Sequence, residues 1–359
     1  MFEIKAGGDI DNKKLSKNKN EQYKYPVYAN ALQNNGLYGY SDIYKISGET
    51  ITVTGRGDVG HAIARKENYY PIVRLLILKP IVKQDVDFWA NAINNTRIFV
   101  ESTGVPQLTA PQLAKIKIYY PSLQEQEKIA AFLTLIDKKI EKQKELIELL
   151  KKYKRGLLSQ IFSQKLRFKD ENGNNYPDWE EKGLGDICTT FSGGTPSITH
   201  QEYYNGDIPF IKSGEIHSDK TEMFITDIGL KNSSAKLVKK GDLLFALYGA
   251  TSGEVDISKI NGAINQAILC VKSDTLNLNY LKELLSYNKN QILCKYLQGG
   301  QGNLSADIFK ALKFKFPIKK EQDKISDFLI NYDKITHIEE HLLNLYINYK
   351  QGLLQQLFI

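Results

Sequence analysis

The chain has 359 residues, more than one domain usually contains, and 42% of them are hydrophobic, which is enough to build folded cores. No apolar run of about eighteen residues and no apolar leader after Met1 is present, so the sequence predicts a cytoplasmic protein without a membrane span or secretory signal. Cys188, Cys270 and Cys294 lack metal-ligand spacing and fit free thiols, and the net charge of +7 suits solubility and a polyanionic partner equally.

Residues 1–120 are predicted to form a first module of mixed α/β structure. Strand-like runs occupy residues 23–29, 49–54 and 72–78, and turn signals lie at Asn34-Asn35-Gly36 and Gly55-Arg56-Gly57. A short helix is predicted to begin at Asp87.

A long helix is predicted from about Gln124 to Phe162, within residues 121–164. Its apolar positions alternate spacings of four and three residues, which is typical of a coiled coil. These seam positions are Ile129, Leu133, Ile136, Ile140, Gln143, Ile147, Leu150, Lys154, Leu157 and Ile161. At the usual helical rise, such a helix would span roughly 55–60 Å, which suits a spacer.

A polar connector and a second module are predicted over residues 165–316. Strands are expected at residues 242–248 and 263–273, and a helix at residues 277–287. A second long helix, from about Glu321 to Phe358, is predicted within residues 317–359. Its seam positions are Ile325, Leu329, Tyr332, Leu343, Tyr346, Leu353 and Leu357.

The two long helices repeat one another. Residues 121–162 return as residues 317–358 at a constant offset without a gap, and the match continues weakly upstream, where Lys117 faces Lys313. An ungapped repeat around less similar regions indicates duplicated helices that place two divergent modules. The recurring positions indicate a shared packing or docking geometry, and the predicted partner-docking pairs are Gln126 and Gln322, Phe132 and Phe328, Asp137 and Asp333, and Tyr153 and Tyr349.

Several longer motifs carry a family resemblance. The second module contains SGGTPS (192–197), NGDIPFIKSGEI (205–216), KKGDLLFALYGATSGEV (239–255), GAINQAI (262–268) and GQGNLSADIFKALKFKFP (300–317). The first module contains YPVYANALQNNG (25–36) and ITVTGRGDVG (51–60). Over nearly its whole length, the chain resembles the specificity (S) subunit of type I restriction-modification systems.

The resemblance implies an α+β protein with two α/β target recognition domains. Two long spacer helices, packed as an antiparallel coiled coil in a pseudo-twofold arrangement, would separate these domains. Each domain would read one half of a bipartite double-stranded DNA sequence. Two modification (methyltransferase) subunits are expected to dock on the helices, and restriction (endonuclease and translocase) subunits would join them. The chain itself would be non-catalytic, without a cofactor or a metal.

The two modules differ in one respect at their beginnings. The leader LRFKDENGNNYPDWEEKGLGDI (166–187) precedes the second module and has no counterpart before the first. If Gly7-Gly8 matches Gly193-Gly194, the first recognition domain is expected to be shortened at its N-terminal side and to lack an edge strand.

Polar and aromatic residues in the loops of each module are candidates for DNA contact. Asn and Gln can pair with adenine, Lys and Arg with guanine, and Tyr or Ser with phosphate. In the first module the candidates are Tyr28, Asn30, Asn34, Asn35, Tyr38, Tyr40 and Arg56. In the second they are Lys212, Ser213, Tyr248, Gln298, Gln301 and Asn303.

Other functions receive less support from the sequence. The GRGDVG motif (55–60) matches G-x-G-x-x-G, but an apolar strand pattern follows within a few residues and no acidic residue lies about twenty positions on, so a tight turn is favoured over a dinucleotide site. His337 and His341 lie one helical turn apart without the zincin order or a third ligand. A protein–protein adaptor with two interaction modules on a coiled-coil spacer is the alternative, and a self-contained enzyme is a third hypothesis without a supporting motif.

Overall fold

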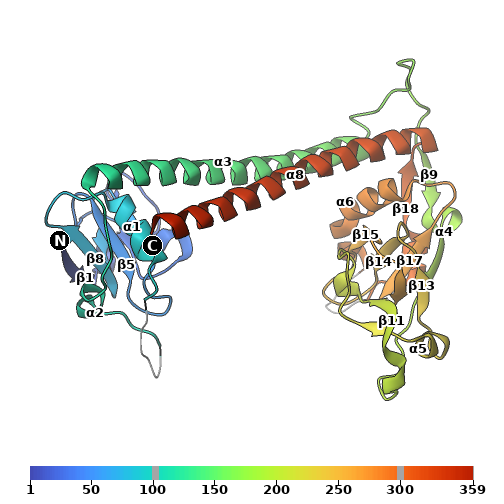
Figure 1. The fold of residues 1–359 in the computed structure, drawn as a ribbon. Helices are drawn as coiled ribbons and strands as arrows, with labels where there is room; N and C mark the ends of the chain where they lie inside the picture. Colours follow the sequence, from blue (N-terminus) through green and yellow to red (C-terminus); the bar gives the residue numbers. More distant parts are fainter. Residues whose placement is uncertain (99–104, 297–302, 359) are drawn as a thin grey trace. The chain divides into compact units, whose positions relative to one another are not determined.

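The computed structural model describes residues 1–98, 105–296 and 303–358 (Figure 1). Contacts divide the chain into two compact units. The first unit contains Met1–Leu146 and Glu339–Ile359, and the second contains Ile147–Ile338. Within the described ranges, no helix is long and apolar enough to cross a membrane.

The larger sheet of the first unit is antiparallel. Its strand order is β1 (Phe2–Ala6), β8 (Leu75–Pro80), β5 (Thr50–Thr54) and β6 (Ala62–Arg65). The strands predicted at residues 49–54 and 72–78 are therefore confirmed as β5 and β8. All residues of β5 are buried, because the strand lies between β8 and β6.

A smaller mixed sheet carries the loop that the sequence singled out. Its order is β2 (Leu15–Ser16), β4 (Leu37–Ser41), β3 (Tyr25–Tyr28) and β7 (Tyr70–Pro71). A short 3-10 turn, η1 (Asn12–Lys14), precedes β2, and η2 (Gln33–Gly36) joins β3 to β4. Asn34 and Asn35 have φ angles of 48° and 53°, a left-handed conformation that asparagine tolerates better than most residues. The predicted turn is confirmed.

Two helices cover the larger sheet. The helix α1 (Val86–Asn95) begins at the cap residue Asp85, whose side chain accepts a hydrogen bond from the Phe88 amide at 2.8 Å. Phe88 and Ile93 belong to the same buried cluster as Ile51 in β5. The shorter α2 (Ala110–Ala114) has a capping box between Thr109 and Gln112.

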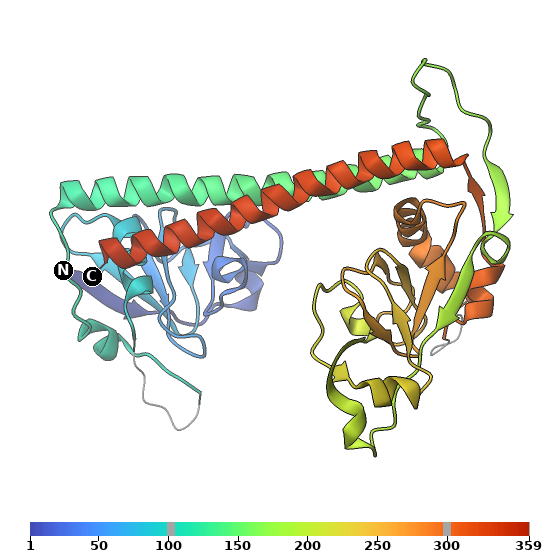
Figure 2. The same cartoon turned by 45° about the vertical axis from the view of Figure 1, so that its right-hand side comes forward.

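The second unit also contains two four-stranded sheets (Figure 2). One has the order β10 (Thr189–Ser192), β17 (Ile268–Lys272), β14 (Leu243–Ala246) and β15 (Val255–Ile257). The other has the order β12 (Phe224–Ile225), β11 (Tyr204–Ile211), β16 (Gly262–Ile264) and β13 (Lys236–Val238). A separate pair is formed by β9 (Glu180–Gly183) and β18 (Lys313–Phe316).

The prediction of one strand at residues 263–273 is wrong, because that segment belongs to two different sheets. It forms β16 and β17, and a turn at Asn265 separates them: the Asn265 carbonyl accepts from the Ile268 amide and its side chain from the Ala267 amide. An Asx turn inside an apolar run explains the break.

Helices surround the sheets of the second unit. They are α4 (Leu184–Ile187), α5 (Asp227–Lys231), α6 (Leu278–Tyr296) and α7 (Ala306–Ala311), with the 3-10 turns η3 (Gln201–Tyr203) and η4 (Ser213–Glu215). The helix predicted at residues 277–287 is α6, which is longer than predicted because its amphipathic pattern continues to Tyr296.

Both long helices are confirmed. They are α3 (Leu123–Phe162) and α8 (Lys319–Leu357), and each starts at the equivalent residue of the repeat. Every predicted seam residue of α3 is buried or half-buried. In α8 the seam prediction is wrong at Leu357, the last residue of the helix, which is exposed.

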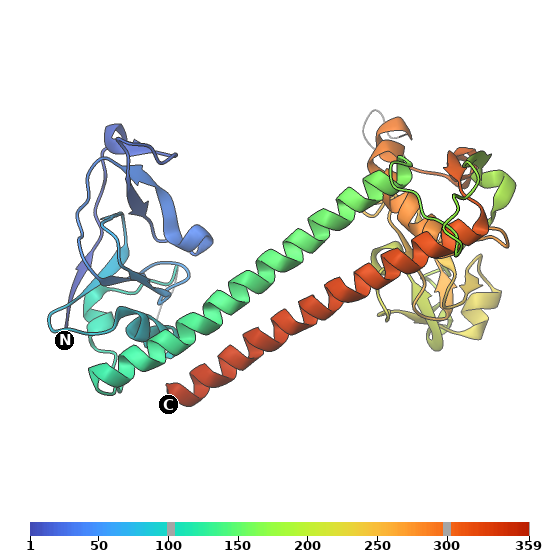
Figure 3. The same cartoon turned by 90° about the horizontal axis from the view of Figure 1, so that it is seen from above.

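The helices pair antiparallel within each unit. In the first unit, early residues of α3 lie beside late residues of α8, and the Gln143 amide donates to the Glu339 carboxylate at 2.6 Å (Figure 3). In the second unit, late residues of α3 lie beside early residues of α8, and the Tyr332 hydroxyl donates to the Leu150 carbonyl at 2.9 Å. Each domain core is therefore completed by the start of one long helix and the end of the other.

Candidate nucleic-acid interface

Asn30 connects the β3–β4 loop to the turn after β5. Its Oδ1 accepts from the amides of Gly55 at 2.6 Å and Arg56 at 3.1 Å, and its Nδ2 donates to the Arg56 carbonyl at 2.7 Å. The amide group is therefore occupied within the protein. Base reading by Asn30 would require these hydrogen bonds to break, so the geometry favours a positioning role for it.

Arg65 and Tyr28 pack against each other and support the same loop from the protein interior. The Arg65 guanidinium lies 3.5 Å from the centre of the Tyr28 ring, and its Nη2 donates to the Asn35 carbonyl at 2.5 Å. Burial, followed by the hydrogen bond to Glu67, raises the pKa of Tyr28 to about 12, so its hydroxyl stays protonated. Both side chains are buried and fix the loop that contains Asn34 and Asn35.

The exposed candidates of the first unit lie on this loop and on the neighbouring turn. Asn34, Asn35 and Tyr38 are exposed on the loop and β4, and Arg56 is exposed on the turn. The Asn30 hydrogen bonds bring the loop and the turn together. Tyr40 is half-buried and faces Ser16 across the β2–β4 ladder.

Gln107 is a polar residue that the sequence reasoning missed. It forms an isolated antiparallel bridge with Arg56, flanked by hydrogen bonds from the Leu108 amide to the Gly55 carbonyl and from the Gly57 amide to the Pro106 carbonyl. A side chain on Gly55 would approach the Arg74 and Leu108 carbonyls at 2.5 and 3.0 Å, so glycine permits this close approach. Pairing with a turn about fifty residues away left no signal in the sequence pattern.

A group of exposed lysines was also missed. They lie on the segment that leads through β2 to β3, and β2 pairs with β4 beside Tyr40. The group consists of Lys13, Lys14, Lys17, Lys19 and Lys24. Lysines of this kind can contact phosphates without reading sequence.

In the second unit, Tyr248 occupies the position that Arg56 has in the first. Thr54 in β5 and Ala246 in β14 are the matching strand ends, since each pairs with the first residue of the neighbouring strand, Leu75 and Ile268. The Leu304 amide donates to the Leu247 carbonyl at 2.8 Å, as the Leu108 amide does to Gly55. Exposed Asn303, the residue before Leu304, is therefore the counterpart of Gln107, the residue before Leu108.

The other candidates of the second unit are less closely grouped. Lys212 and Ser213 follow β11 in the other sheet, where the Lys212 amide donates to the Glu215 carboxylate at 3.1 Å. Within the described ranges, no hydrogen bond or ion pair connects them to Tyr248. Gln298 and Gln301 lie outside the described residues.

Gln126 and Gln322 have the same internal role in the two units. Their Nε2 groups donate to the carbonyls of Pro121 and Pro317 at 3.0 and 2.9 Å. Their Oε1 atoms accept from the amides of Asp85 and Asn277, the residues that cap α1 and α6. Both glutamines are buried, so they join each long helix to its domain and are not accessible to a partner.

Asp137 and Asp333 form reciprocal ion pairs between the long helices. Lys350 lies 2.5 Å from Asp137 in the first unit, and Lys154 lies 2.7 Å from Asp333 in the second. Both pairs follow the offset of the repeat. The recurrence of the two aspartates is thus explained by helix pairing.

The remaining docking candidates are exposed to matching extents. Phe132 and Phe328 are 44% and 37% exposed, and Tyr153 and Tyr349 are 60% and 58% exposed. Leu149 and Leu345, one turn before the tyrosines, are 62% and 49% exposed and were missed. We name these six residues the helix surface set. Large apolar side chains exposed at equivalent positions of both copies suit a partner that binds twice.

The structure excludes the dinucleotide interpretation of residues 55–60. A hairpin to antiparallel β6 follows the turn, so no helix N-terminus is available to hold a pyrophosphate. His337 and His341 are exposed on α8. Among the residues with described positions, no group of His, Cys, Asp and Glu could hold a metal ion.

Comparisons with known proteins agree on one family. The model of the type I restriction modification DNA specificity domain matches residues 1–152 and 176–345. Over 119 residues the chain is 34% identical to the putative type I specificity subunit S.MpnORF507P of Mycoplasma pneumoniae, covering 33% of each protein. It is 26% identical over 229 residues to the type I restriction enzyme MjaIX specificity subunit of Methanocaldococcus jannaschii, covering 58% of this chain and 52% of that protein.

The fold is also found in a solved structure. The crystal structure of a type I restriction-modification system S subunit from M. genitalium matches with a TM-score of 0.64 and 17% identity, over 100% of this chain and 94% of that one. The two curated relatives are matched over only about a third and about half of their own length.

Proposed function

The chain belongs to the type I restriction modification DNA specificity family, and we propose that it is the DNA-reading, non-catalytic subunit of such a system. Each unit would contribute one recognition domain, with boundaries near residues 1–120 and 165–316, and each domain would bind one half of a bipartite double-stranded sequence. The segments 121–164 and 317–359 would join the domains and bind the other subunits.

One observation carries this proposal: the same framework presents different side chains in the two units. In both, the residue after the central strand lies beside the segment before a short capped helix, and a buried glutamine joins the domain to its long helix. The side chains at these positions differ, with exposed Arg56 and Gln107 in one unit and half-buried Tyr248 and exposed Asn303 in the other. A shared backbone framework that carries different polar side chains suits the reading of two different half-sites.

The helix surface set supports binding of two modification subunits. Each unit carries one phenylalanine, one leucine and one tyrosine from this set, because Phe132 belongs to the first unit with Leu345 and Tyr349. Two equivalent surfaces would accept two copies of the same methyltransferase subunit, and restriction subunits would bind that core. Catalysis of methylation and cleavage would belong to these partners.

The proposal is tested by expressing the chain with its modification subunit and sequencing the methylated DNA. We expect methylation of one bipartite sequence, and DNA binding whose affinity falls steeply with salt. In the purified complex, insertion of one or two base pairs between the half-sites should weaken binding, because each added pair rotates and shifts one half-site relative to the other.

Three outcomes would overturn the proposal. Equal binding to scrambled DNA would remove sequence reading, and an assembled complex without DNA affinity would favour the protein–protein adaptor. Methylation by the isolated chain would contradict the non-catalytic assignment.

A further inference from the structure

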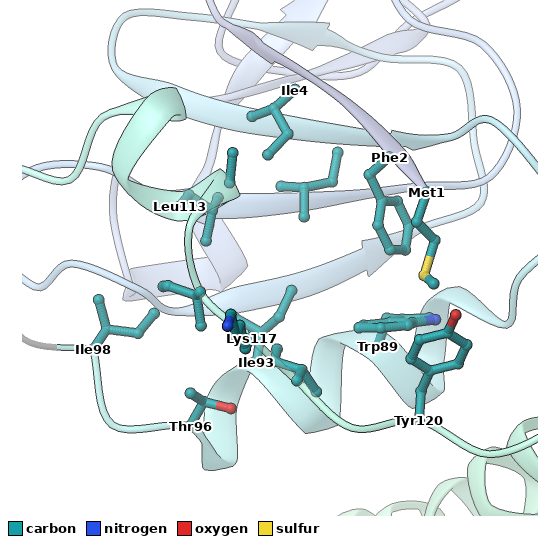
Figure 4. Close-up of a pocket in the computed structure, with 14 residues that line it drawn as sticks. Met1, Phe2, Ile4, Trp89, Ile93, Thr96, Ile98, Leu113, Lys117 and Tyr120 are labelled. Atoms are coloured by element: carbon teal, nitrogen blue, oxygen red, sulfur yellow. The ribbon is translucent and has the colours of Figure 1, made fainter.

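A group of charged side chains in the second unit differs in kind from the groove of the first unit. That groove lies between β1, α1 and the segment after α2 and is lined mainly by apolar residues such as Phe2 and Leu113 (Figure 4). In the second unit, a histidine lies between two carboxylates. His217 Nδ1 lies 3.0 Å from Asp256 Oδ2, and its Nε2 lies 3.3 Å from Glu254 Oε2. These contacts join two segments that are distant in the sequence.

The segment that contains His217 also contains two of the DNA-contact candidates. It begins at Lys212, directly after β11, and passes through η4 to β12. The Glu215 carboxylate organises it, since it accepts from the Lys212 amide at 3.1 Å and from the Thr221 hydroxyl at 3.0 Å. Lys212, Ser213 and His217 are therefore held within one ordered segment.

The two carboxylates belong to the hairpin whose turn contains Tyr248. The Ala246 amide donates to the Glu254 carbonyl at 2.8 Å, so Glu254 lies at the base of the turn, and Asp256 follows in β15. The residue before the histidine, Ile216, is buried in the same cluster as Ala246. The ring contacts therefore connect the segment of the DNA-contact candidates to the base of the turn.

The first unit joins the corresponding segments through an uncharged group. The hydrogen bond between Ala246 and Glu254 has its counterpart in the Thr54 amide, which donates to the His61 carbonyl at 3.0 Å. There the amide of Asn30 holds the β3–β4 loop to the turn after β5. The two units thus share a link between loop and turn, and only the second unit makes this link with ionisable side chains.

Lysines on neighbouring elements complete the charged group. Lys289 of α6 lies 2.5 Å from Glu254, and its hydrogen bond lowers the pKa of that carboxyl, so Glu254 stays ionised beside the ring. Lys259, after β15, donates to the His217 carbonyl and lies 3.8 Å from Asp256. The charged residues around the ring are Glu254, Asp256 and Lys259 from the hairpin, Lys282 and Lys289 from α6, and Glu215, Asp219 and Lys220 from its own segment.

The charge on the His217 ring decides how strong the link is. A neutral imidazole has one N–H group, so only one of the two carboxylates can accept a hydrogen bond from it, and the other faces a ring lone pair. A protonated ring donates from both nitrogens, and hydrogen bonds between charged groups are the stronger kind. Histidine is the side chain that ordinarily changes charge near neutral pH. The link is therefore strongest when the ring carries a proton, and it weakens as the pH rises.

We propose that His217 is a positioning residue of the second recognition domain, whose proton regulates how firmly Lys212 and Ser213 are held relative to the Tyr248 turn. Base discrimination at the second half-site then falls as the pH rises and the ring loses its proton. Discrimination at the first half-site, where the Asn30 amide makes the link, does not follow this change. The inference rests on the proposed DNA reading and adds proton regulation of one half-site.

The test uses the complex of the full chain with its modification subunit and the bipartite sequence found by methylation sequencing. Discrimination is the ratio of the Kd values for duplexes with and without one changed base pair in a half-site. At the second half-site it should fall about three- to tenfold between about pH 6 and about pH 8, since the half-exposed ring exchanges part of each hydrogen bond with water. At the first half-site it should stay constant.

Three variants isolate the proton on this ring. His217→Gln should show the lower discrimination at both pH values, since glutamine is uncharged. His217→Lys should keep the higher discrimination at both, because its ammonium group is charged throughout and has donors for both carboxylates. His200→Gln is the matched control, because His200 is exposed to a similar extent and its Nδ1 lies 2.8 Å from Glu202 within the same short segment. It should retain the pH profile of the wild type.

Hydrogen exchange on the chain without DNA separates this inference from DNA reading. At about pH 6, His217→Gln should speed exchange of the Lys212 amide, because the segment is held less firmly. Unchanged exchange would overturn the link. Discrimination that is independent of pH in the wild type, or equally dependent on pH in His217→Gln, would overturn the role of the proton. If exchange changes as expected but the complex does not read sequence, the proposed function fails while the link stands.

Discussion

Replacing Asn30 by alanine separates a positioning role from base reading. The substitution removes one donor and two acceptor interactions that hold the β3–β4 loop against the turn at Gly55 and Arg56. Hydrogen bonds contribute about 0.5–1.5 kcal/mol each, so three give roughly 1.5–4.5 kcal/mol. Because Asn30 is half-exposed and water replaces part of the loss, we expect destabilisation of the first unit by about 2 kcal/mol.

Calorimetry and hydrogen exchange measure this effect. A loss of about 2 kcal/mol should lower the melting temperature of the first unit by roughly 4–8 °C. The amides of Gly55 and Arg56 should exchange faster, because Asn30 Oδ1 is the acceptor for both. DNA affinity should fall for every sequence of the first half-site, because the whole loop is displaced.

The opposite pattern would refute this reasoning. If melting and exchange were unchanged while discrimination at a single base pair was lost, Asn30 would be a reading residue. Asn34→Gly is the matched control in the same loop, because glycine accepts the left-handed conformation and the Asn34 side chain has no hydrogen bond in the described structure.

Three further predictions follow from the same geometry. Asn34→Gly should leave the melting temperature unchanged. If Asn34 reads a base, the variant should bind one half-site about 5- to 150-fold more weakly in a binding titration, the equivalent of about 1–3 kcal/mol. Unchanged affinity would remove Asn34 from the interface. Lys154→Met should destabilise the second unit by roughly 1–2 kcal/mol in urea unfolding, since Lys154 binds both Asp333 and buried Glu283. Lys350→Met should destabilise the first unit by less, because its partner Asp137 is more exposed. Equal losses of stability would contradict this reasoning. Tyr153→Ala and Tyr349→Ala should each weaken binding of one modification subunit without changing thermal stability, measured by sedimentation of the reconstituted complex, and binding of both copies by the double variant would count against the surface.

The long helices were predictable because their pattern is local. Alternating spacings of four and three residues identified the buried seam of α3 correctly, and the repeat gave both helices nearly their observed ends. The break between β16 and β17 was not predictable in the same way. The run at residues 263–273 is apolar on both sides of Asn265, and only the side-chain turn at that residue directs the two halves into different sheets.

The candidate site likewise has a part that the local sequence predicts and a part that depends on distant contacts. Polar loop residues could be listed from the sequence, but their availability depends on contacts between distant segments. Asn30 and Gln126 are used internally through partners at Gly55 and Asp85, so recurrence and polarity alone could not separate them from exposed residues such as Asn34 and Tyr153. Gln107 was missed because its pairing with Arg56 is also non-local.

The reciprocal use of the helix ends sets the order in which the domains can mature during synthesis. The Phe358 ring packs 5.2 Å from Phe88, and Asn95 donates to the carbonyls of Leu354 and Phe358. The core of the first unit is therefore complete only after the final turns of α8 have been synthesised, and residues 147–338 are synthesised before them. At about 5–20 residues per second this delay is roughly 10–40 s, during which the apolar surface around Phe88 is uncovered. A premature stop codon among the codons for the last few turns of α8 would consequently damage the domain that the ribosome made first.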